Sequence, residues 1–320
     1  MDPKSIVAEI KKTRPQIKSV YFVGCGASKA ELYPGKYFLE KNAKQLRAGH
    51  YTANEFCYAT PAGVNDQAVV ITCSLGGTTP ETVAASKKAM ELGAAVVAVT
   101  HDGESPLAKN AHYVLVHGFE KNYAAKLEKM TGVLALAVEL LNTYEGYAHY
   151  AEMQTAFANI YDLIENTVPY VLPAAKKFAQ EYKDVPVLYV MSSGATQAVA
   201  YTFSLCLKMQ WINCGNFHDG EFFHGPFEIV DKDVPFLLLM NDGPTRPMDA
   251  RALTFLERFQ AKVTLVDGKD YGISSVIPAP VVEYFNPMVL SAVLRVYAEQ
   301  LALVRCHPLT MRRYMWKLEY

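Results

Sequence analysis

One segment of the chain combines glycines with hydroxyl side chains in a way that suits an anion. Residues 73–82 read Cys-Ser-Leu-Gly-Gly-Thr-Thr-Pro-Glu-Thr and follow a valine-rich run. Gly76 and Gly77 would let the backbone approach a phosphate closely, and the hydroxyls of Ser74 and Thr79 could donate hydrogen bonds to it. The proline at 80 suits the first turn of a helix, whose free N–H groups would add to the site. Taken alone, the pattern is more typical of an ordinary helix start.

A second small-residue turn changes that interpretation. Gly-Cys-Gly-Ala-Ser at 24–28 follows another strand-like run at 19–23. Because the turns after neighbouring parallel strands converge at one edge of a sheet, the two segments together favour a phosphate site, which would include Cys25, Gly26 and Ser28. The segments are not a P-loop, which needs a Gly-Lys-Ser/Thr, and they lack the third glycine of a dinucleotide fingerprint.

The richest polar cluster lies at 216–226, which reads Asn-Phe-His-Asp-Gly-Glu-Phe-Phe-His-Gly-Pro. Glu221 and His224 are three residues apart and could share one helical face or flank one loop. A carboxylate near an imidazole makes a natural acid–base pair, because each adjusts the pKa of the other. The same residues also fit a surface helix cap ended by the Gly-Pro pair. His218 with these two could ligate a metal, but H-x-x-E-x-x-H is not a recognised ligand spacing, so we expect no metal.

Composition and charge narrow the class of protein. The 320 residues hold 31 Lys and Arg against 32 Asp and Glu, and this balance argues against a nucleic-acid partner. The amino terminus lacks a secretory profile and no uninterrupted apolar run reaches membrane-spanning length, so we expect no membrane partner. The six cysteines are scattered without a C-x-x-C pair, which favours a reducing compartment. We therefore expect a soluble cytoplasmic protein.

The elements that must position these residues follow a repeated pattern. Valine-rich runs alternate with helical patterns, which predicts parallel βαβ units with helices on both faces of each sheet. Gly26 and Gly194 are 168 positions apart, and Gly76 and Gly243 are 167 apart; two landmarks with nearly one offset indicate a duplication. Strand-like runs are expected at 19–23, 68–72, 94–100 and 112–116, and again at 187–190, 235–240 and 262–267.

We predict an α/β fold of two tandem three-layer α/β/α domains, each with a parallel sheet. The first domain would span 1–150 and the second 151–320, with the chemistry in a pocket between them. Helical sequence from about 130 to 179, broken by Pro169 and Pro173, would join the halves. The ending at 312–320 is too aromatic for a frayed tail, and we expect it to pack over the pocket.

Together, segments 24–28, 73–82 and 220–226 resemble the SIS (sugar isomerase) family, whose two-domain members include the isomerase half of glucosamine-6-phosphate synthase. The resemblance is greatest to fructosamine-6-phosphate deglycases of the fructoselysine-6-phosphate type. It runs almost end to end, through residues 33–34, 53–56, 209–211, 225–229 and 312–317. It implies two tandem SIS domains, each with a flavodoxin-like, five-stranded parallel sheet.

The resemblance also implies roles for individual residues. Hydroxyls of the first two turns hold the sugar phosphate in the family, and by position these are Ser28, Ser74 and Thr79. One family serine falls at Gly76, which keeps only its backbone N–H. The histidine before Gly-Pro, here His224, reaches the sugar and comes from the neighbouring subunit, which implies a homodimer.

The chain departs from the family at position 208. Family members usually carry a glutamate base sixteen residues before that histidine, and here the residue is Lys208. A lysine cannot simply replace a carboxylate base. Either Glu221 takes the role, or Lys208 acts differently, or the activity is altered. A buried lysine facing Glu221 would hold that carboxylate ionised, whereas a lysine in the pocket could pair with the carboxylate or phosphate of a substrate.

The leading functional hypothesis is a deglycase that cleaves a 6-phosphorylated sugar–amino-acid conjugate. The chemistry needs a base, a proton donor and an anchored phosphate, but no cofactor; Glu221 and His224 are the candidates for base and acid. One alternative is an aldose–ketose or amino-sugar phosphate isomerase or deaminase. Another is a phosphosugar sensor without turnover, which the missing glutamate at 208 favours and the intact segment 220–226 disfavours. We expect no glutamine-dependent synthesis, since the sequence shows no glutaminase domain with an amino-terminal cysteine.

Overall fold

The computed structural model describes residues 1–119 and 122–319, and the chain divides into two compact units. The first unit comprises Met1–Tyr161 and Ile277–Tyr284, and the second comprises Asp162–Val276 and Phe285–Tyr320. The division falls inside a long helix, past the predicted boundary between 150 and 151. The first unit also takes a short segment from late in the chain, which the sequence pattern does not reveal.

The first unit is built on a parallel sheet. Within the described residues it has five strands in the order β2-β1-β3-β4-β5, which is the predicted flavodoxin-like arrangement. β3 and β4 are buried along their whole length, because helices cover both faces of the sheet. The strands are β1 (Ser19–Gly24), β2 (Arg47–Thr52), β3 (Ala68–Cys73), β4 (Ala95–Thr100) and β5 (Tyr113–Val116).

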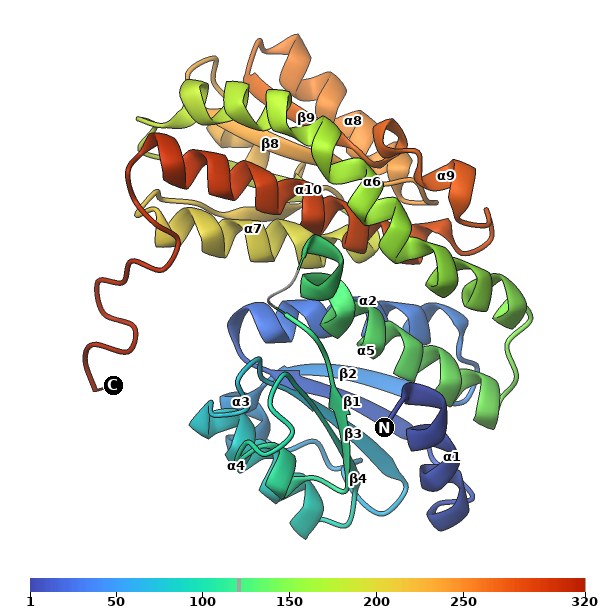
Figure 1. Ribbon diagram of the computed structural model, residues 1–320. Coiled ribbons are helices and arrows are strands. Elements are labelled where there is room, and N and C mark those ends of the chain that lie inside the picture. The colour runs from blue at the N-terminus through green and yellow to red at the C-terminus, as the bar shows by residue number, and fades with distance from the viewer. Residues whose placement is uncertain (120–121, 320) are drawn as a thin grey trace. The chain divides into compact units, whose positions relative to one another are not determined.

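Helices flank this sheet on both sides, as Figure 1 shows: α1, α2 and α5 lie over one face and α3 and α4 over the other. α4 begins at Pro80, as predicted. The helices of the first unit are α1 (Pro3–Thr13), α2 (Gly26–Asn42), α3 (Ala53–Tyr58), α4 (Pro80–Glu91) and α5 (Tyr123–Tyr144), with a 3-10 turn η1 (Ala108–Asn110).

One long helix, α6 (Tyr150–Tyr182), leads from the first unit into the second. The prediction that Pro169 and Pro173 break this helix is wrong, because both lie inside it. Both prolines are exposed, so water can bind the carbonyl groups that their missing N–H groups would have bound. The interruption falls earlier, between the end of α5 and Tyr150.

The second unit has a smaller parallel sheet. Its order is β7-β6-β8-β9, so the described residues form four strands and not the five predicted. By the repeat offset of 167, β5 corresponds to residues 280–283, where α10 begins; Pro280 is the first of these residues and Pro278 lies just before them. Proline has no N–H for a sheet ladder, which disfavours a strand there. The strands are β6 (Tyr189–Ser192), β7 (Asn216–His218), β8 (Pro235–Met240) and β9 (Lys262–Asp267).

Helices α6, α7 and α10 lie on one side of this sheet and α8 on the other (Figure 1). α8 packs Ala252 and Leu256 against Phe222, Phe236 and Leu238 in a buried apolar cluster. The remaining elements are η2 (Gly194–Thr196), α7 (Gln197–Met209), η3 (Pro226–Ile229), α8 (Arg246–Arg258), η4 (Gly268–Tyr271), α9 (Ile273–Val276) and α10 (Val282–Val304).

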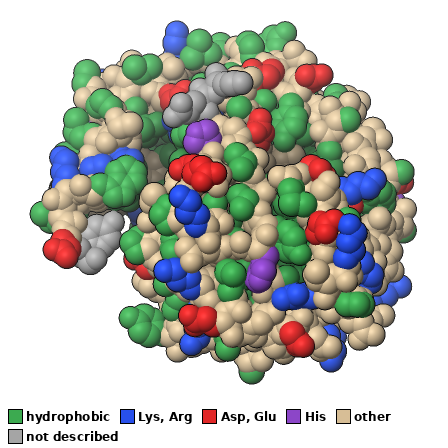
Figure 2. Space-filling view, turned by 60° about the horizontal axis from the view of Figure 1, so that its bottom comes forward, with side chains coloured by type: hydrophobic (Ala, Val, Ile, Leu, Met, Phe, Trp, Pro, Cys, Tyr) green, Lys and Arg blue, Asp and Glu red, His purple; other side chains and the backbone are tan. Residues whose placement is uncertain are grey.

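Helix α10 is relevant to the expectation that the protein has no membrane partner. Among the described residues it is the one helix long and apolar enough to cross a bilayer, which the sequence pattern did not suggest. Within its most apolar window, 61% of the helix is buried inside the protein, as in the core helix of a globular fold. The face in Figure 2 mixes acidic and basic side chains, in line with the near-zero formal charge.

Candidate functional site

The structure brings the two small-residue turns of the first unit together. β1 and β3 are neighbouring parallel strands, with Gly24 in register with Cys73. The turns that follow them therefore lie side by side at the carboxyl edge of the sheet. The strand order reverses between β1 and β3, and ligands of open α/β sheets bind at such a reversal.

The turn after β3 is shaped for a small anion. The Ser74 side chain is buried, and its Oγ lies 2.9 Å from Thr79 Oγ1. Thr79 precedes α4, yet its side chain makes no capping bond to that helix, so its hydroxyl can serve a ligand. Gly77 has a φ of +65°, and a Cβ there would lie 2.1 Å from Ser105 Oγ. Only glycine fits at this position.

The turn after β1 leaves space beside its backbone at the same carboxyl edge of the sheet. Gly26 has a φ of +54°, and a Cβ there would meet nothing within 4 Å. Cys25 caps α2 without a side-chain hydrogen bond to the helix, and its sulfur receives a weak contact from the Thr82 hydroxyl at 4.0 Å. The half-buried Ser28 hydrogen bonds to Cys73. Burial raises the pKa of the Cys73 thiol to about 12, so Cys73 is no nucleophile.

A buried ion pair joins the two helices that flank this turn. Glu31 on α2 contacts Lys129 on α5, and both side chains are largely buried. Burial is the largest single influence and would lower the pKa of the Lys129 ammonium, but the charge of Glu31, its hydrogen bond and a contribution from Cys73 together outweigh burial and raise that pKa. The pair therefore stays charged and fixes α2, whose first turn carries Ser28, against α5. Sequence reasoning missed this pair, because a single lysine in an apolar helix does not reveal its partner.

In the second unit, the matching turns are filled by the chain itself. The repeat offset of 167 pairs Asn241 with Ser74 and Asp249 with Thr82. The Asp249 carboxylate accepts hydrogen bonds from the Ser193 hydroxyl, from Asn241 N at 3.0 Å and from Asn241 Nδ2 at 2.6 Å. A buried carboxylate thus takes the donors that an anion would need, so this edge is closed to phosphate.

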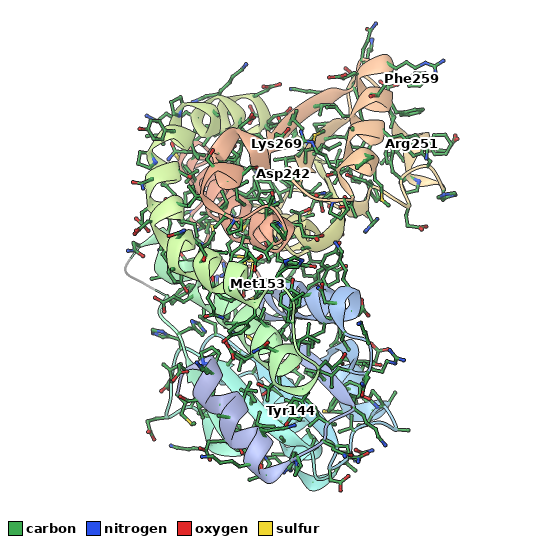
Figure 3. The ribbon with its side chains drawn as sticks, turned by 90° about the vertical axis from the view of Figure 1, so that its right-hand side faces the viewer. Tyr144, Met153, Asp242, Arg251, Phe259 and Lys269 are labelled. Atoms are coloured by element: carbon green, nitrogen blue, oxygen red, sulfur yellow. The ribbon has the colours of Figure 1, made fainter. Side chains whose placement is uncertain are left out.

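Neighbouring polar groups of the same turn are also bound internally. Asp242 lies 3.5 Å from the Lys269 ammonium, and both residues are labelled in Figure 3. Asn241 Nδ2 makes a further hydrogen bond to Thr245 Oγ1 at 2.9 Å. The edge of the first sheet is therefore the candidate anion site.

A second carboxyl group is buried against Asp249. Asp219 is 2% exposed and follows β7 directly. Burial, together with the hydrogen bond and charge of Asp249, raises the pKa of Asp219 to about 9. Asp219 is therefore protonated at neutral pH and shares a proton with its partner. Sequence reasoning missed this pair because its members are thirty residues apart and belong to different elements.

Asp219 opens the loop that carries Glu221 and His224. The sequence allowed either a shared helical face or a loop for Glu221 and His224, and the structure shows a loop. Residues 219–225 form a series of turns in which His224 N donates a hydrogen bond to Glu221 O at 2.9 Å. Phe222 anchors the loop in the core, while Glu221 and His224 are exposed. Among the described residues neither side chain has a hydrogen bond or ion pair, so both are available to a ligand. His218 Nδ1 accepts a hydrogen bond from Gly220 N at 3.0 Å.

Lys208 does not occupy the buried position expected of a general base. It is exposed near the end of α7, and its ammonium hydrogen bonds to Cys214. Burial raises the pKa of the Cys214 thiol, and Lys208 opposes that shift. The hypothesis that Lys208 is buried and faces Glu221 is therefore wrong. Lys208 instead lines a groove with part of the carboxyl-terminal tail; the last residue of the tail lies outside the described residues.

Comparisons with known proteins agree with this architecture. The SIS domain model matches residues 16–138. The fructosamine deglycase FrlB of Bacillus subtilis (strain 168) is 39% identical over 307 residues, which cover 95% of this chain and 93% of FrlB. A fructoselysine 6-phosphate deglycase of Escherichia coli (strain K12) is 24% identical over 265 residues, covering 82% of this chain and 76% of the other.

A solved structure from Salmonella typhimurium LT2, assigned provisionally as a phosphosugar isomerase, superimposes with a TM-score of 0.94 at 42% identity. The match covers 100% of this chain and 98% of that one. The chain therefore belongs to the SIS (sugar isomerase) domain family. Within that family it is closely related to the fructosamine deglycase FrlB.

Proposed function

We propose that the protein is a deglycase of 6-phosphorylated fructosamines, such as fructoselysine 6-phosphate, and that both halves are SIS domains. The observation that carries this proposal is the meeting of two glycine and hydroxyl turns where the strand order reverses. It occurs in a chain 39% identical to a fructosamine deglycase. The internal carboxylate at the matching edge of the second unit supports a single phosphate site per chain.

The proposed reaction proceeds by acid–base chemistry on the open-chain ketosamine. Glu221 removes a proton from C1, the electron pair forms a C1–C2 double bond, and the C2 carbonyl oxygen takes up a proton, which gives an enolamine. His224 then protonates C2 while the amino-acid nitrogen releases its proton, which yields an imine between C1 and that nitrogen. Water adds at C1 and the amine leaves, so the products are glucose 6-phosphate and a free amino acid. The phosphate, held by Ser74 and Thr79, fixes the substrate while these protons move.

The phosphate site can be tested by binding alone. Replacing both Ser74 and Thr79 by alanine removes two hydrogen bonds to a charged group, at a cost of roughly 3–6 kcal/mol before water compensates. We expect the affinity for glucose 6-phosphate, measured by calorimetry, to fall by at least about a hundredfold. Thr245→Ala, in the matching turn of the second unit, is the control and should bind like the parent. Parental affinity in the double variant would remove this site from the proposal.

A non-catalytic phosphosugar sensor is the second candidate. The exposed Lys208, at the position where the family carries a glutamate, favours it. Turnover separates the two candidates, since a sensor would bind glucose 6-phosphate and release no amino acid from any conjugate. Under either function we propose a cytoplasmic homodimer in which His224 completes the pocket of its neighbour.

A further inference from the structure

A groove of about 450 Å³ lies in the second unit between the end of α7 and the tail that follows α10. Lys208, Met209 and Trp211 line one side of it. Met311, Arg312 and Arg313 line the other side. Both sides belong to the same compact unit, so the groove is a property of that unit alone.

The groove is strongly cationic. Its lining holds Lys208, Arg312 and Arg313 and no aspartate or glutamate. Within residues 1–119 and 122–319, none of the three has a carboxylate at ion-pair distance. Arg312 Nε is buried without a hydrogen-bond partner among those residues. Three cations without a counter-charge suit an anionic ligand.

The other lining side chains are mostly apolar, apart from Asn213 and the Tyr314 hydroxyl, and Trp211 among them is held in place. The Arg313 guanidinium lies 4.2 Å from the centre of the Trp211 ring, and that ring packs edge-on against His307 at 4.4 Å. Trp211 has a φ of +58°, a conformation that bulky residues rarely adopt. Such strain persists where the surroundings enforce it and is concentrated at functional sites. The strained tryptophan and the three cations without a carboxylate partner lie in the same groove.

We propose that this groove binds the carboxylate of the amino-acid part of the conjugate, with its hydrocarbon chain against Trp211 and the methionines. The identity of the ligand rests on the proposed function. The groove differs from the phosphate turns of the first unit, which offer glycine N–H groups and hydroxyls. Here guanidinium and ammonium groups meet apolar surface, which suits an organic carboxylate better than a free phosphate.

The two tryptophans of the chain provide a reporter. Trp211 lines the groove, and Trp316 lies 5.3 Å from the guanidinium of Arg312. Two probes that differ only in the carboxylate are the 6-phosphofructosyl conjugates of 6-aminohexanoate and of pentylamine. We expect a saturable change in tryptophan fluorescence, with the aminohexanoate probe binding about tenfold more tightly or better. Inorganic phosphate should not remove this preference at the concentrations used.

Matched variants test whether the preference for the carboxylate probe arises from the groove. Arg313→Gln and Lys208→Gln should each reduce it to threefold or less. Arg258→Gln removes another arginine that lies over an aromatic ring, outside the groove, and should keep the preference. Circular dichroism checks that each variant is folded. Equal affinity of the parent for both probes, no response to either, or an unchanged preference in Arg313→Gln would overturn the inference. If the proposed function alone fails, carboxylate-dependent binding persists but neither probe releases its amine.

Discussion

The buried Asp219–Asp249 pair makes stability depend on pH in a way that one substitution should abolish. The folded pKa of Asp219 lies near 9, whereas an unfolded aspartate titrates near 3.8. Between these values the folded chain holds a proton that the unfolded chain has released, so stability falls as pH rises. The amide introduced by Asp219→Asn cannot ionise and can still donate a hydrogen bond to the carboxylate of Asp249.

The size of the effect follows from linkage. Each pH unit inside the window lowers the free energy of unfolding by about 1.4 kcal/mol, or about 3 kcal/mol from pH 5 to pH 7. Asp219→Asn should lose the part of this slope that Asp219 contributes and should be more stable than the parent at pH 7; any slope that remains would come from Asp249, whose pKa burial also raises. Urea unfolding at pH 5, 6 and 7, followed by circular dichroism, measures the slope. Asp184→Asn, at an exposed position, is the control and should keep it. The same slope in parent and Asp219→Asn would refute the shared proton.

Two further predictions concern the phosphate turn and the dimer. Gly77→Ala should lower the melting temperature and weaken glucose 6-phosphate binding, because its Cβ would clash with Ser105 in a left-handed backbone position; parental melting and affinity would contradict the described turn. If His224 completes the pocket of a neighbour, mixing His224→Ala chains with chains defective in Ser74 should restore part of the activity, since one pocket of each heterodimer has neither defect. No recovery after verified subunit exchange would show that each chain supplies its own histidine.

Burial explains which parts of the fold could be predicted from sequence. β3, β4 and β8 are buried throughout, and their unbroken apolar runs showed them clearly. β2 and β7 are partly exposed edge strands of polar and small residues, without an apolar run to mark them.

Contacts explain which parts of the site could be predicted. The two turns of the first unit were predicted because parallel strands must end at one edge. The carboxyl pair depends on a tertiary contact that no local pattern encodes. The exposure of Lys208 follows from how α7 packs, which spacing along the chain does not show.

Release of an amino acid tests the central proposal most directly. The intact protein is incubated with fructoselysine 6-phosphate and, separately, with glucoselysine 6-phosphate, and free lysine and hexose 6-phosphate are measured together. A deglycase of fructosamines should convert fructoselysine 6-phosphate into equal amounts of lysine and glucose 6-phosphate. Binding of glucose 6-phosphate with no release of lysine from either conjugate would contradict the proposal and favour a sensor.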